Sequence, residues 1–265
     1  MKAMIFAAGL GTRLKPLTDN CPKALIPVGS KPMLQIVIEQ LKKHGFNEII
    51  LNVHYLAEQI YDFIEKNNQF DISIRFSDET DELLETGGGL WKARHFFDDG
   101  KPFLLCNADV LTNINLEKLY NAHLQNNAIS TLAVRERNSS RYLLFDDNDI
   151  LFGWENVKTE EVKIPRKIPR HCERSEAIST EKEDSFVPRH DVPYPLHEKA
   201  FSGYHIISPK IFETCKRDGV FSMVDWYLDI CNEHTIKCFH HQEDIWIDIG
   251  SIEQLEKAKE AINQF

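Results

Sequence analysis

Residues 1–28 read MKAMIFAAGLGTRLKPLTDNCPKALIPV, and this stretch decides the fold. Its first eight residues are almost all apolar and predict a buried β-strand that runs directly into a glycine loop. Gly9 and Gly11 let the backbone turn and approach a ligand closely, and successive N–H groups in such a loop form a concavity that binds anions. Arg13 and Lys23 add two positive charges. The stretch therefore predicts a site for the phosphates of a nucleotide.

Two better-known glycine loops do not match this segment. A P-loop requires Gly-x-x-x-x-Gly-Lys-Ser/Thr, which residues 9–15 lack, and a dinucleotide fingerprint requires a third glycine where Leu14 stands. Pro16 and Pro22 keep the following chain extended, because proline lacks an N–H and restricts the residue before it. The alternative is a strand followed by a plain glycine turn with solvated charges. That alternative does not explain why glycines, threonine, prolines and cations occur together, whereas a phosphate site would use all of them.

Strand and helix patterns alternate through the first half of the chain. Strands are predicted at 2–8, 48–53, 71–76, 102–107 and 129–134, and helices at 32–44, 57–67, 89–97 and 116–125. This alternation is typical of right-handed βαβ crossovers and a mostly parallel sheet. Because ligands of such sheets bind at the carboxyl ends of the strands, we expect the glycine loop and Asp109 to meet at one crevice.

The second half has a mixed pattern. Residues 141–147 and 149–154 predict a hairpin around an Asp/Asn turn, strands are predicted at 200–207, 235–240 and 245–249, and helices after Ser208, at 222–231 and at 251–263. We expect this half to continue the same sheet.

Two aspartates follow or interrupt apolar runs. Asp109 ends the run LLCNAD, and Asp248 lies within WIDIG. Burying a carboxylate without a partner is costly, so the pair fits a divalent cation held between them. Mg²⁺ prefers one or two carboxylates together with water and substrate phosphates. The alternative for Asp248 is a structural role before the turn at Gly250.

The motifs resemble those of a known family. Residues 7–18 (AAGLGTRLKPLT) and 22–27 (PKALIP) resemble the signature of the sugar-1-phosphate nucleotidyltransferases, which join a nucleoside triphosphate to a sugar 1-phosphate and release pyrophosphate. The similarity continues through shorter motifs, GSKPM at 29–33, ETGGG at 85–89, NAD at 107–109, FSG at 201–203 and WIDIG at 246–250. It covers most of the chain except roughly residues 158–198.

The resemblance implies a fold and a set of site residues. The fold is α/β, with a mostly parallel Rossmann-like sheet, helices on both faces and a smaller mixed acceptor lobe, in one nucleotidyltransferase domain spanning residues 1–265. The implied catalytic residues are Arg13, Lys23 and Asp109, and the implied Mg²⁺ ligands are Asp109 and Asp248. The nucleotide contacts would come from Ala8, Gly9, Gly11, Thr12, Arg13, Lys23, Gly87 and Gly88, and the sugar contacts from Gly203 and Asp225.

The glycines at 87–89 form a second element. Consecutive glycines are poor helix formers, so at the start of a predicted helix they indicate a turn or a close approach. The resemblance places this segment against the nucleobase and ribose, with backbone groups of Gly87 and Gly88 at the base edge. The alternative is a flexible start of the helix.

The substrates remain open between several acceptors. The short chain and ETGGG are most similar to N-acetylmuramate 1-phosphate uridylyltransferases of cell-wall recycling, which use UTP, whereas mannose-1-phosphate guanylyltransferases, which use GTP, share nearly the same amino-terminal motif. A cytidylyltransferase acting on phosphocholine is a further possibility. A binding or regulatory module is the alternative outside enzymes, but a silent relative has no need to keep Arg13, Lys23, Asp109 and Asp248 together.

Residues 158–198 depart from the family pattern. The segment contains a repeated basic-proline unit, KIPRKIPR at 163–170, and five prolines, and residues 171–179 (HCERSEAIS) resemble translated palindromic repeats inserted into bacterial genes. We expect a surface insertion, which loop-closure entropy tolerates at little cost. A lid or a specificity loop is the alternative.

Composition sets the outer limits. The net charge of −10 argues against a general nucleic-acid partner, and no apolar run approaches the ~20 residues of a membrane span. The six cysteines form no Cys-x-x-Cys pair, and Met1 leads directly into a strand without a signal peptide, which together favour the reducing cytoplasm. We expect all eleven histidines to be structural, including the adjacent His240 and His241, and the chain to act as a monomer or small homo-oligomer.

Overall fold

The computed structural model describes residues 1–165, 192 and 195–262. Their strands are β1 Lys2–Phe6, β2 Pro27–Val28, β3 Lys31–Pro32, β4 Glu48–Val53, β5 Ser73–Asp78, β6 Phe103–Asn107, β7 Val110–Thr112, β8 Ser130–Arg135, β9 Arg141–Phe145, β10 Leu151–Asn156, β11 Glu161–Lys163, β12 His197–Ile207, β13 Ile236–His240 and β14 Trp246–Asp248. Their α-helices are α1 Met33–Lys43, α2 Ala57–Lys66, α3 Glu85–Ala93, α4 Leu116–Asn126, α5 Met223–Ile230 and α6 Ile252–Ala261.

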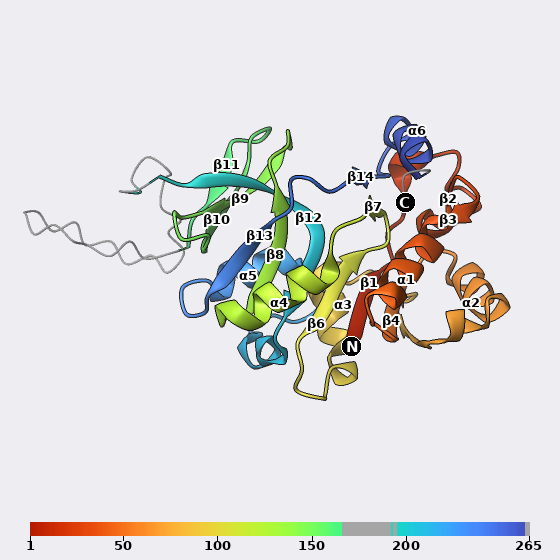
Figure 1. The fold of residues 1–265 in the computed structure, drawn as a ribbon, viewed down its shortest axis with the longest axis horizontal. Helices are drawn as coiled ribbons and strands as arrows, with labels where there is room; N and C mark the ends of the chain where they lie inside the picture. The colour runs from red at the N-terminus through yellow and green to blue at the C-terminus, as the bar shows by residue number, and fades with distance from the viewer. Residues whose placement is uncertain (166–191, 193–194, 263–265) are drawn as a thin grey trace, which may run out of the picture.

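A ten-stranded sheet organises the molecule (Figure 1). Its main path runs β11-β10-β9-β12-β6-β1-β4-β5, with β8 paired to β12 and β13 paired to β8. The amino-terminal half is parallel, because β1 pairs in parallel with both β4 and β6, and β4 with β5. The predicted α/β class with a mostly parallel central sheet is confirmed.

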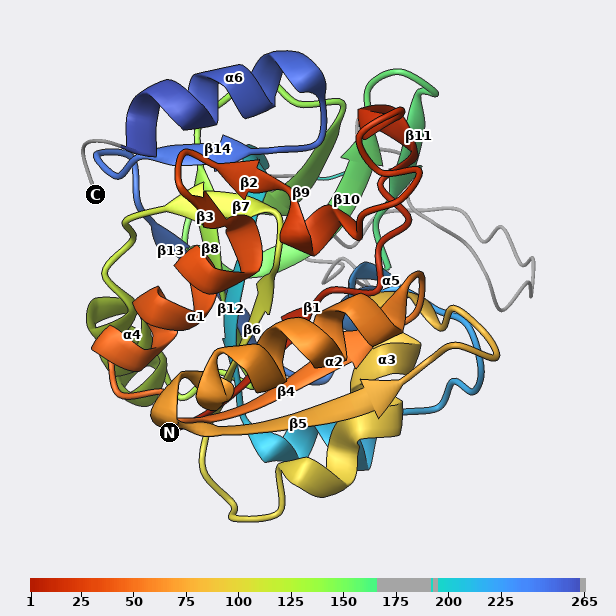
Figure 2. The same ribbon diagram turned by 90° about the vertical axis from the view of Figure 1, so that its right-hand side faces the viewer.

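Helices cover both faces of this sheet, which explains why β1 is apolar at nearly every position. Ala3 and Ile5 pack into the cluster that also holds buried residues of α1, α2 and α4. Met4 points the other way, into the cluster formed with α3 and α5. Figure 2 shows α1 and α4 on one side of β1 and β6, and α3 and α5 on the other.

The second half makes the sheet mixed, since most of its pairs are antiparallel and β13 pairs in parallel with β8. The long strand β12 pairs with β6, β8 and β9, and β9 and β10 form the predicted hairpin. Two short strands, β7 and β14, pair outside the main sheet. The Ser208-Pro209 signal leads into a 3-10 helix at Pro209–Thr214 rather than an α-helix, and Ser208 makes no side-chain cap there.

Two further predictions of local structure are wrong in detail. The strand predicted to reach residue 8 ends at Phe6, where the chain leaves the sheet toward the glycine loop. The helix predicted to start at Gly89 starts at Glu85, so the three glycines lie inside its first turns. The short strands β2, β3 and β7 were not predicted, because two or three residues carry no periodicity.

The structure describes only the two ends of the proposed insertion at 158–198. On one side β11 pairs with β10, and Ile164 is fully buried against Leu144 and Phe152. On the other side Val192 and Leu196 pack against the same small cluster. Residues 166–191 and 193–194, which carry most of the predicted insertion, lie outside the described residues. None of the described helices is both long enough and apolar enough to cross a membrane.

Candidate active site

The carboxyl ends of β1 and β6 lie side by side. Phe6 is in register with Asn107, and the amide of Ala108 donates to the Phe6 carbonyl at 3.1 Å. The two loops that follow therefore begin at the same edge of the sheet. This brings the glycine loop and Asp109 together, as the sequence predicts.

The glycine loop is held in shape from within. Gly11 has a φ of 64°, and its carbonyl accepts hydrogen bonds from the Thr18 hydroxyl and the Leu14 amide, both at 2.9 Å. A Cβ on Gly11 would meet Thr18 Cγ2 at 2.8 Å, so the loop requires glycine there for two reasons. Gly9 differs: no atom lies within 4 Å of the position its Cβ would take, and this glycine faces open space.

A strand pair brings Asp248 to Asp109. In the β14–β7 ladder Asp248 is opposite Val110, and the Ile249 amide donates to the Asp109 carbonyl at 2.9 Å. Burial, and then the charge of nearby Asp109, raise the pKa of the Asp248 carboxyl. Its Oδ1 atom is buried and has no hydrogen-bond partner among the described residues. The two predicted metal ligands are thus neighbours that repel each other.

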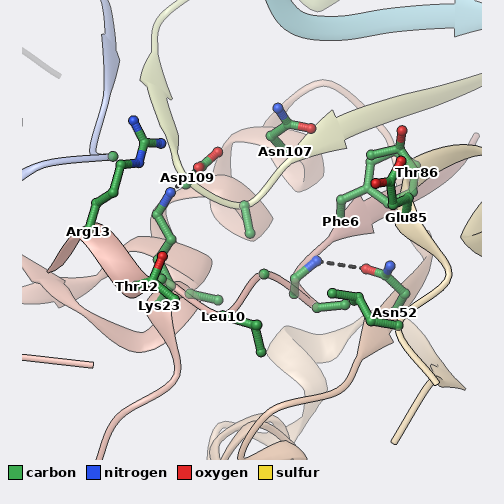
Figure 3. A pocket seen from close by; sticks show the side chains of 18 of the residues that line it. Phe6, Leu10, Thr12, Arg13, Lys23, Asn52, Glu85, Thr86, Asn107 and Asp109 are labelled. Atoms are coloured by element: carbon green, nitrogen blue, oxygen red, sulfur yellow. Dashed lines mark hydrogen bonds and ion pairs between the residues drawn. The ribbon is translucent and has the colours of Figure 1, made fainter. Parts of the chain in front are cut away.

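Two cations lie near these carboxylates, and Figure 3 shows both of them beside Asp109. The Lys23 ammonium pairs with Asp109 Oδ2. Arg13 lies against the turn after β14, since a Cβ on Gly250 would come within 2.7 Å of Arg13 Nη2. The charges of Lys23 and Arg13 both lower the pKa of Asp248, yet burial outweighs them.

The donor set fits a divalent cation. Mg²⁺ takes oxygen ligands and is commonly held by one or two carboxylates while it keeps waters and substrate phosphates. Asp109 and Asp248 supply such carboxylates, and the buried, unpartnered Oδ1 of Asp248 is the kind of atom that a cation would satisfy.

A buried amide–carboxyl pair supports the loop, and sequence reasoning missed it. Asn52 Oδ1 accepts from the Ala7 amide at 2.7 Å, and its Nδ2 donates to Glu79 Oε1 at 2.9 Å. Glu79 is fully buried, burial raises its pKa, and its Oε2 accepts from the Leu84 amide. This network joins the loop after β1 to the start of α3. The one sequence signal was a polar Asn52 within the apolar run EIILNV.

The glycines of α3 contact the protein itself. The amides of Gly87 and Gly88 both donate to the Phe221 carbonyl, at 2.9 and 3.1 Å, so their N–H groups are occupied and do not face the cavity. A Cβ on Gly88 would lie 2.3 Å from the Gly219 carbonyl oxygen. The predicted close approach is therefore real, but it is an approach of α3 to the segment before α5. The prediction that backbone groups of Gly87 and Gly88 contact a base edge stays a prediction, and their amides are not available for it. In this segment Glu85 and Thr86 line the cavity.

A cavity of about 570 Å³ lies at this edge of the sheet. Asp248, Gly87 and Gly88 are not among the residues that line it. The predicted residues that line it are Ala8, Gly9, Gly11, Thr12, Arg13, Lys23 and Asp109. The predicted sugar contacts lie outside its lining. Gly203, with a φ of 80°, packs against the side chain of Asn107, which does line the cavity. Asp225 lies in the first turn of α5, where its amide donates to the N-cap hydroxyl of Ser222 and its carboxylate accepts from that hydroxyl, and it pairs with Lys163 at 3.5 Å.

Arg141 lines the cavity from the start of β9, and sequence reasoning did not single it out. Its side chain forms no ion pair with any residue that the structure describes. A permanent cation without an ion pair among the described residues, in a cavity that already holds Arg13 and Lys23, favours a ligand with more than one anionic group.

The family model described as nucleotidyl transferase matches residues 2–148. A UTP--glucose-1-phosphate uridylyltransferase of Synechocystis sp. is 36% identical over 146 residues, which are 51% of this chain and 37% of that protein. An N-acetylmuramate alpha-1-phosphate uridylyltransferase of Neisseria meningitidis serogroup B is 44% identical over 115 residues, 43% of this chain and 49% of that protein. The chain therefore matches less than half the length of either relative.

The fold likeness extends over the whole chain. The crystal structure of HddC from Yersinia pseudotuberculosis has a TM-score of 0.71 at 24% identity and covers 98% of both chains. At this identity the likeness concerns the fold alone, and it includes the second half that the family model leaves unmatched.

Proposed function

The chain belongs to the nucleotidyl transferase family, and from this premise we propose that it joins UTP to N-acetylmuramate 1-phosphate, giving a nucleoside diphosphate sugar and pyrophosphate. One observation carries the proposal: the glycine loop, Lys23 and Asp109 line one cavity, and the β14–β7 pair places Asp248 next to Asp109. The cavity volume is typical of small-molecule sites. We also propose that the protein acts in the cytoplasm, takes part in cell-wall recycling and forms a monomer or a small homo-oligomer.

The proposed reaction is a single in-line displacement. An oxygen of the sugar 1-phosphate forms a bond to the α-phosphorus, and the bond from that phosphorus to the pyrophosphate oxygen breaks. The attacking phosphate is already ionised at neutral pH, so no general base is required. The work left to the protein is positioning and stabilisation of charge.

Each loop residue has a distinct proposed role. The amides of residues 9–12 and the Arg13 guanidinium hold the β- and γ-phosphates, which leave as pyrophosphate. Lys23 stabilises the charge on the α-phosphate and on the incoming sugar phosphate. Before substrate binds, its ammonium pairs with Asp109, which keeps the side chain directed at the reacting phosphates.

Asp109 and Asp248 would hold Mg²⁺. When bound, such an ion polarises a phosphoryl oxygen and offsets negative charge. The two carboxylates also repel each other, and this repulsion makes the site favour a cation over an empty state.

Arg141 supports an acceptor with a second anionic group. N-acetylmuramate carries a carboxylate that glucose, mannose and N-acetylglucosamine lack, and Arg141 offers the cavity a guanidinium, which binds carboxylates in a bidentate way. The likeness to the uridylyltransferase of Neisseria meningitidis supports the same acceptor and UTP.

A substrate matrix tests the proposal. Pyrophosphate release is measured for the four nucleoside triphosphates against the 1-phosphates of N-acetylmuramate, N-acetylglucosamine, mannose and glucose, and against phosphocholine. We expect the highest kcat/KM with UTP and N-acetylmuramate 1-phosphate. Preference for GTP with mannose 1-phosphate, or for CTP with phosphocholine, would replace the proposed substrates. No release with any pair would favour a binding module.

Variants test the roles within the matrix. Asp109→Ala should abolish most pyrophosphate release even in excess Mg²⁺, and Lys23→Ala should lower kcat far more than nucleotide affinity. Arg141→Ala should lower kcat/KM about tenfold or more for N-acetylmuramate 1-phosphate and leave the residual rate with N-acetylglucosamine 1-phosphate unchanged. An equal loss on both acceptors would place Arg141 on the nucleotide instead.

A further inference from the structure

Three metal-ligating side chains meet outside the cavity, and the proposed reaction uses none of them. They are Asp149 from the β9–β10 turn and Cys238 and His240 from β13. In the sheet β13 is separated from β1 by β8, β12 and β6, so the cluster lies several strands from the phosphate loop (Figure 1). None of the three residues lines the cavity.

Their donor atoms are already close together. His240 Nε2 lies 2.9 Å from Asp149 Oδ1, Cys238 Sγ lies 3.3 Å from the same oxygen, and Sγ and Nε2 are 3.4 Å apart. One oxygen, one nitrogen and one sulfur thus form a compact triangle. Sequence reasoning missed it and treated His240 as structural, because Cys238 and His240 lack a familiar metal-binding spacing and Asp149 is 89 residues from Cys238.

The backbone fixes this arrangement. Cys238 and His240 are two residues apart on one strand, so their side chains share a face. Asp149 has a φ of 59°, and its carbonyl accepts from the Cys238 amide at 3.1 Å. The turn is therefore fastened to β13 by main-chain contacts, and the triangle does not depend on flexible side chains alone.

We propose that Asp149, Cys238 and His240 form a binding site for a transition-metal dication of the zinc type, with water in the fourth position. Thiolate, imidazole and carboxylate are the zinc ligands found in proteins, and three protein ligands with an open position are a familiar set. Mg²⁺, by contrast, prefers oxygen ligands. This site is independent of the proposed function.

The distances agree with a tetrahedral ion. With bonds of about 2.0 Å to oxygen and nitrogen and about 2.3 Å to sulfur, tetrahedral donors lie roughly 3.3–3.6 Å apart. The observed separations of 2.9–3.4 Å are shorter by a few tenths of an ångström. Small side-chain rotations would therefore admit the ion without movement of the strands.

Protonation couples to binding in a predictable direction. Burial raises the pKa of the Cys238 thiol, so the thiol keeps its proton until a metal displaces it. Metal binding should therefore release a proton and weaken as the pH falls. Bound metal would also tie the β9–β10 turn to β13 and stabilise the fold by linkage.

Zinc titration of the purified, metal-free chain tests the site, with Co²⁺ as the spectroscopic probe. We expect one tight Zn²⁺ equivalent, and a Co²⁺ complex with intense tetrahedral d–d bands and a thiolate charge-transfer band. Cys238→Ala and His240→Ala should each weaken binding at least tenfold and remove the thiolate band or the tetrahedral spectrum. His240 is half exposed, so its variant should fold normally.

A second histidine–aspartate pair provides the matched control. His197 Nε2 lies 2.8 Å from Asp147 Oδ1, and this pair is not part of the group formed by Asp149, Cys238 and His240. His197→Ala should therefore leave Zn²⁺ affinity unchanged. Equal Zn²⁺ affinity of the wild type and Cys238→Ala, or a weak octahedral Co²⁺ spectrum without a thiolate band, would overturn the proposal. The triangle would then be a hydrogen-bonded cluster only.

Discussion

Asp248 carries a burial cost that its neighbours Lys23 and Arg13 relieve only in part. Its Oδ1 is buried without a hydrogen-bond partner in the described part of the chain, and burial followed by the charge of Asp109 raises its pKa. A carboxyl whose pKa is raised in the folded state keeps its proton longer than in the unfolded chain. Stability therefore falls as the pH rises from the unfolded pKa of about 3.9 through the folded pKa. At neutral pH the ionised form is destabilising.

Asp248→Asn should raise the melting temperature of the cation-free protein at pH 7 by a few degrees. About 1 kcal/mol shifts a chain of this size by roughly 2–4 °C. The gain should shrink as the pH falls toward the unfolded pKa of about 3.9 and be lost below it, because the raised folded pKa then no longer separates the two states. Mg²⁺ should raise the melting temperature of the wild type and not of the variant. A variant that melts lower at pH 7, or that keeps the full Mg²⁺ effect, would contradict the assignment of Asp248 as a cation ligand.

A substitution at Gly9 can show whether glycine is needed there for stability or for binding the nucleotide. Nothing lies within 4 Å of the position of its Cβ, and its φ lies outside the left-handed region, so Gly9→Ala should leave the melting temperature unchanged within about 1 °C. If the open space there receives a phosphate, the methyl group should lower kcat/KM for the nucleotide about tenfold or more. Unchanged kinetics would place the phosphates elsewhere in the cavity.

For the helix α3, the sequence predicted a close approach but neither the partner of that approach nor the start of the helix. Three glycines in a row predicted a close approach, and the structure confirms one. The partner could not be predicted, because the carbonyls of Gly219 and Phe221 belong to a loop more than 130 residues away. Propensity alone also placed the helix start too late, since it counts glycine as a breaker and does not see the tertiary contacts that favour it.

Gly88→Ala should destabilise the protein. Alanine is favoured over glycine within a helix by about 1 kcal/mol, but its Cβ would lie 2.3 Å from the Gly219 carbonyl oxygen, which is backbone and cannot rotate away. Overpacking of this kind costs about 1–3 kcal/mol, so a net fall in melting temperature of several degrees is expected by calorimetry. Gly9→Ala is the control without a steric contact. A higher melting temperature for Gly88→Ala would mean that helix propensity decides the outcome.

The pairing of β14 with β7 is a second element that the sequence did not reveal. A strand was predicted at 245–249, where β14 lies, but β7 has three residues, too few for a pattern. The register of the pair places Asp248 opposite Val110 and next to Asp109. The sequence predicted that both aspartates belong to one site from their apolar surroundings and the family resemblance. The short ladder supplies the reason that two residues so far apart in the chain meet. Asn52 and Glu79 escaped prediction because a buried polar network has no periodic signal.

For the whole molecule, the alternation of strands and helices was sufficient to predict the parallel half of the sheet. Continuous apolar runs such as those of β4 and β6 predicted strands covered on both faces, and both are. The order of the antiparallel strands was beyond reach, because β12 joins the two halves by pairing with β6, β8 and β9 at once. Strand order depends on long-range packing that no local pattern encodes.

Both described ends of the 158–198 segment converge on one small cluster. Ile164 is fully buried with Leu144 and Phe152, and Val192 packs against the same residues. Gly153 accommodates the crossing chain, since a Cβ there would lie 2.6 Å from the Lys163 carbonyl oxygen. The Asn232 amide group also donates to the Pro165 carbonyl at 2.6 Å. The part of the segment up to residue 165 therefore belongs to the fold. Because Ile164 and Val192 pack in the same cluster, we expect a short linker to join residue 165 to Val192.

Two deletions of different length test this boundary. Removing residues 166–191 and closing the gap with a short Gly/Ser linker should leave melting and turnover unchanged, because both flanking residues stay in place. Removing 161–191 also deletes β11 and Ile164. Burial of one isoleucine contributes about 1.5–3 kcal/mol, so the longer deletion should lower the melting temperature by roughly 4–10 °C. Calorimetry with and without nucleotide, alongside turnover on the best sugar phosphate, separates the outcomes. Equal destabilisation by both deletions would show that residues 166–191 contribute to the fold. Unchanged melting with lost turnover in the shorter deletion would show that they serve the acceptor, and the surface-insertion hypothesis would be wrong.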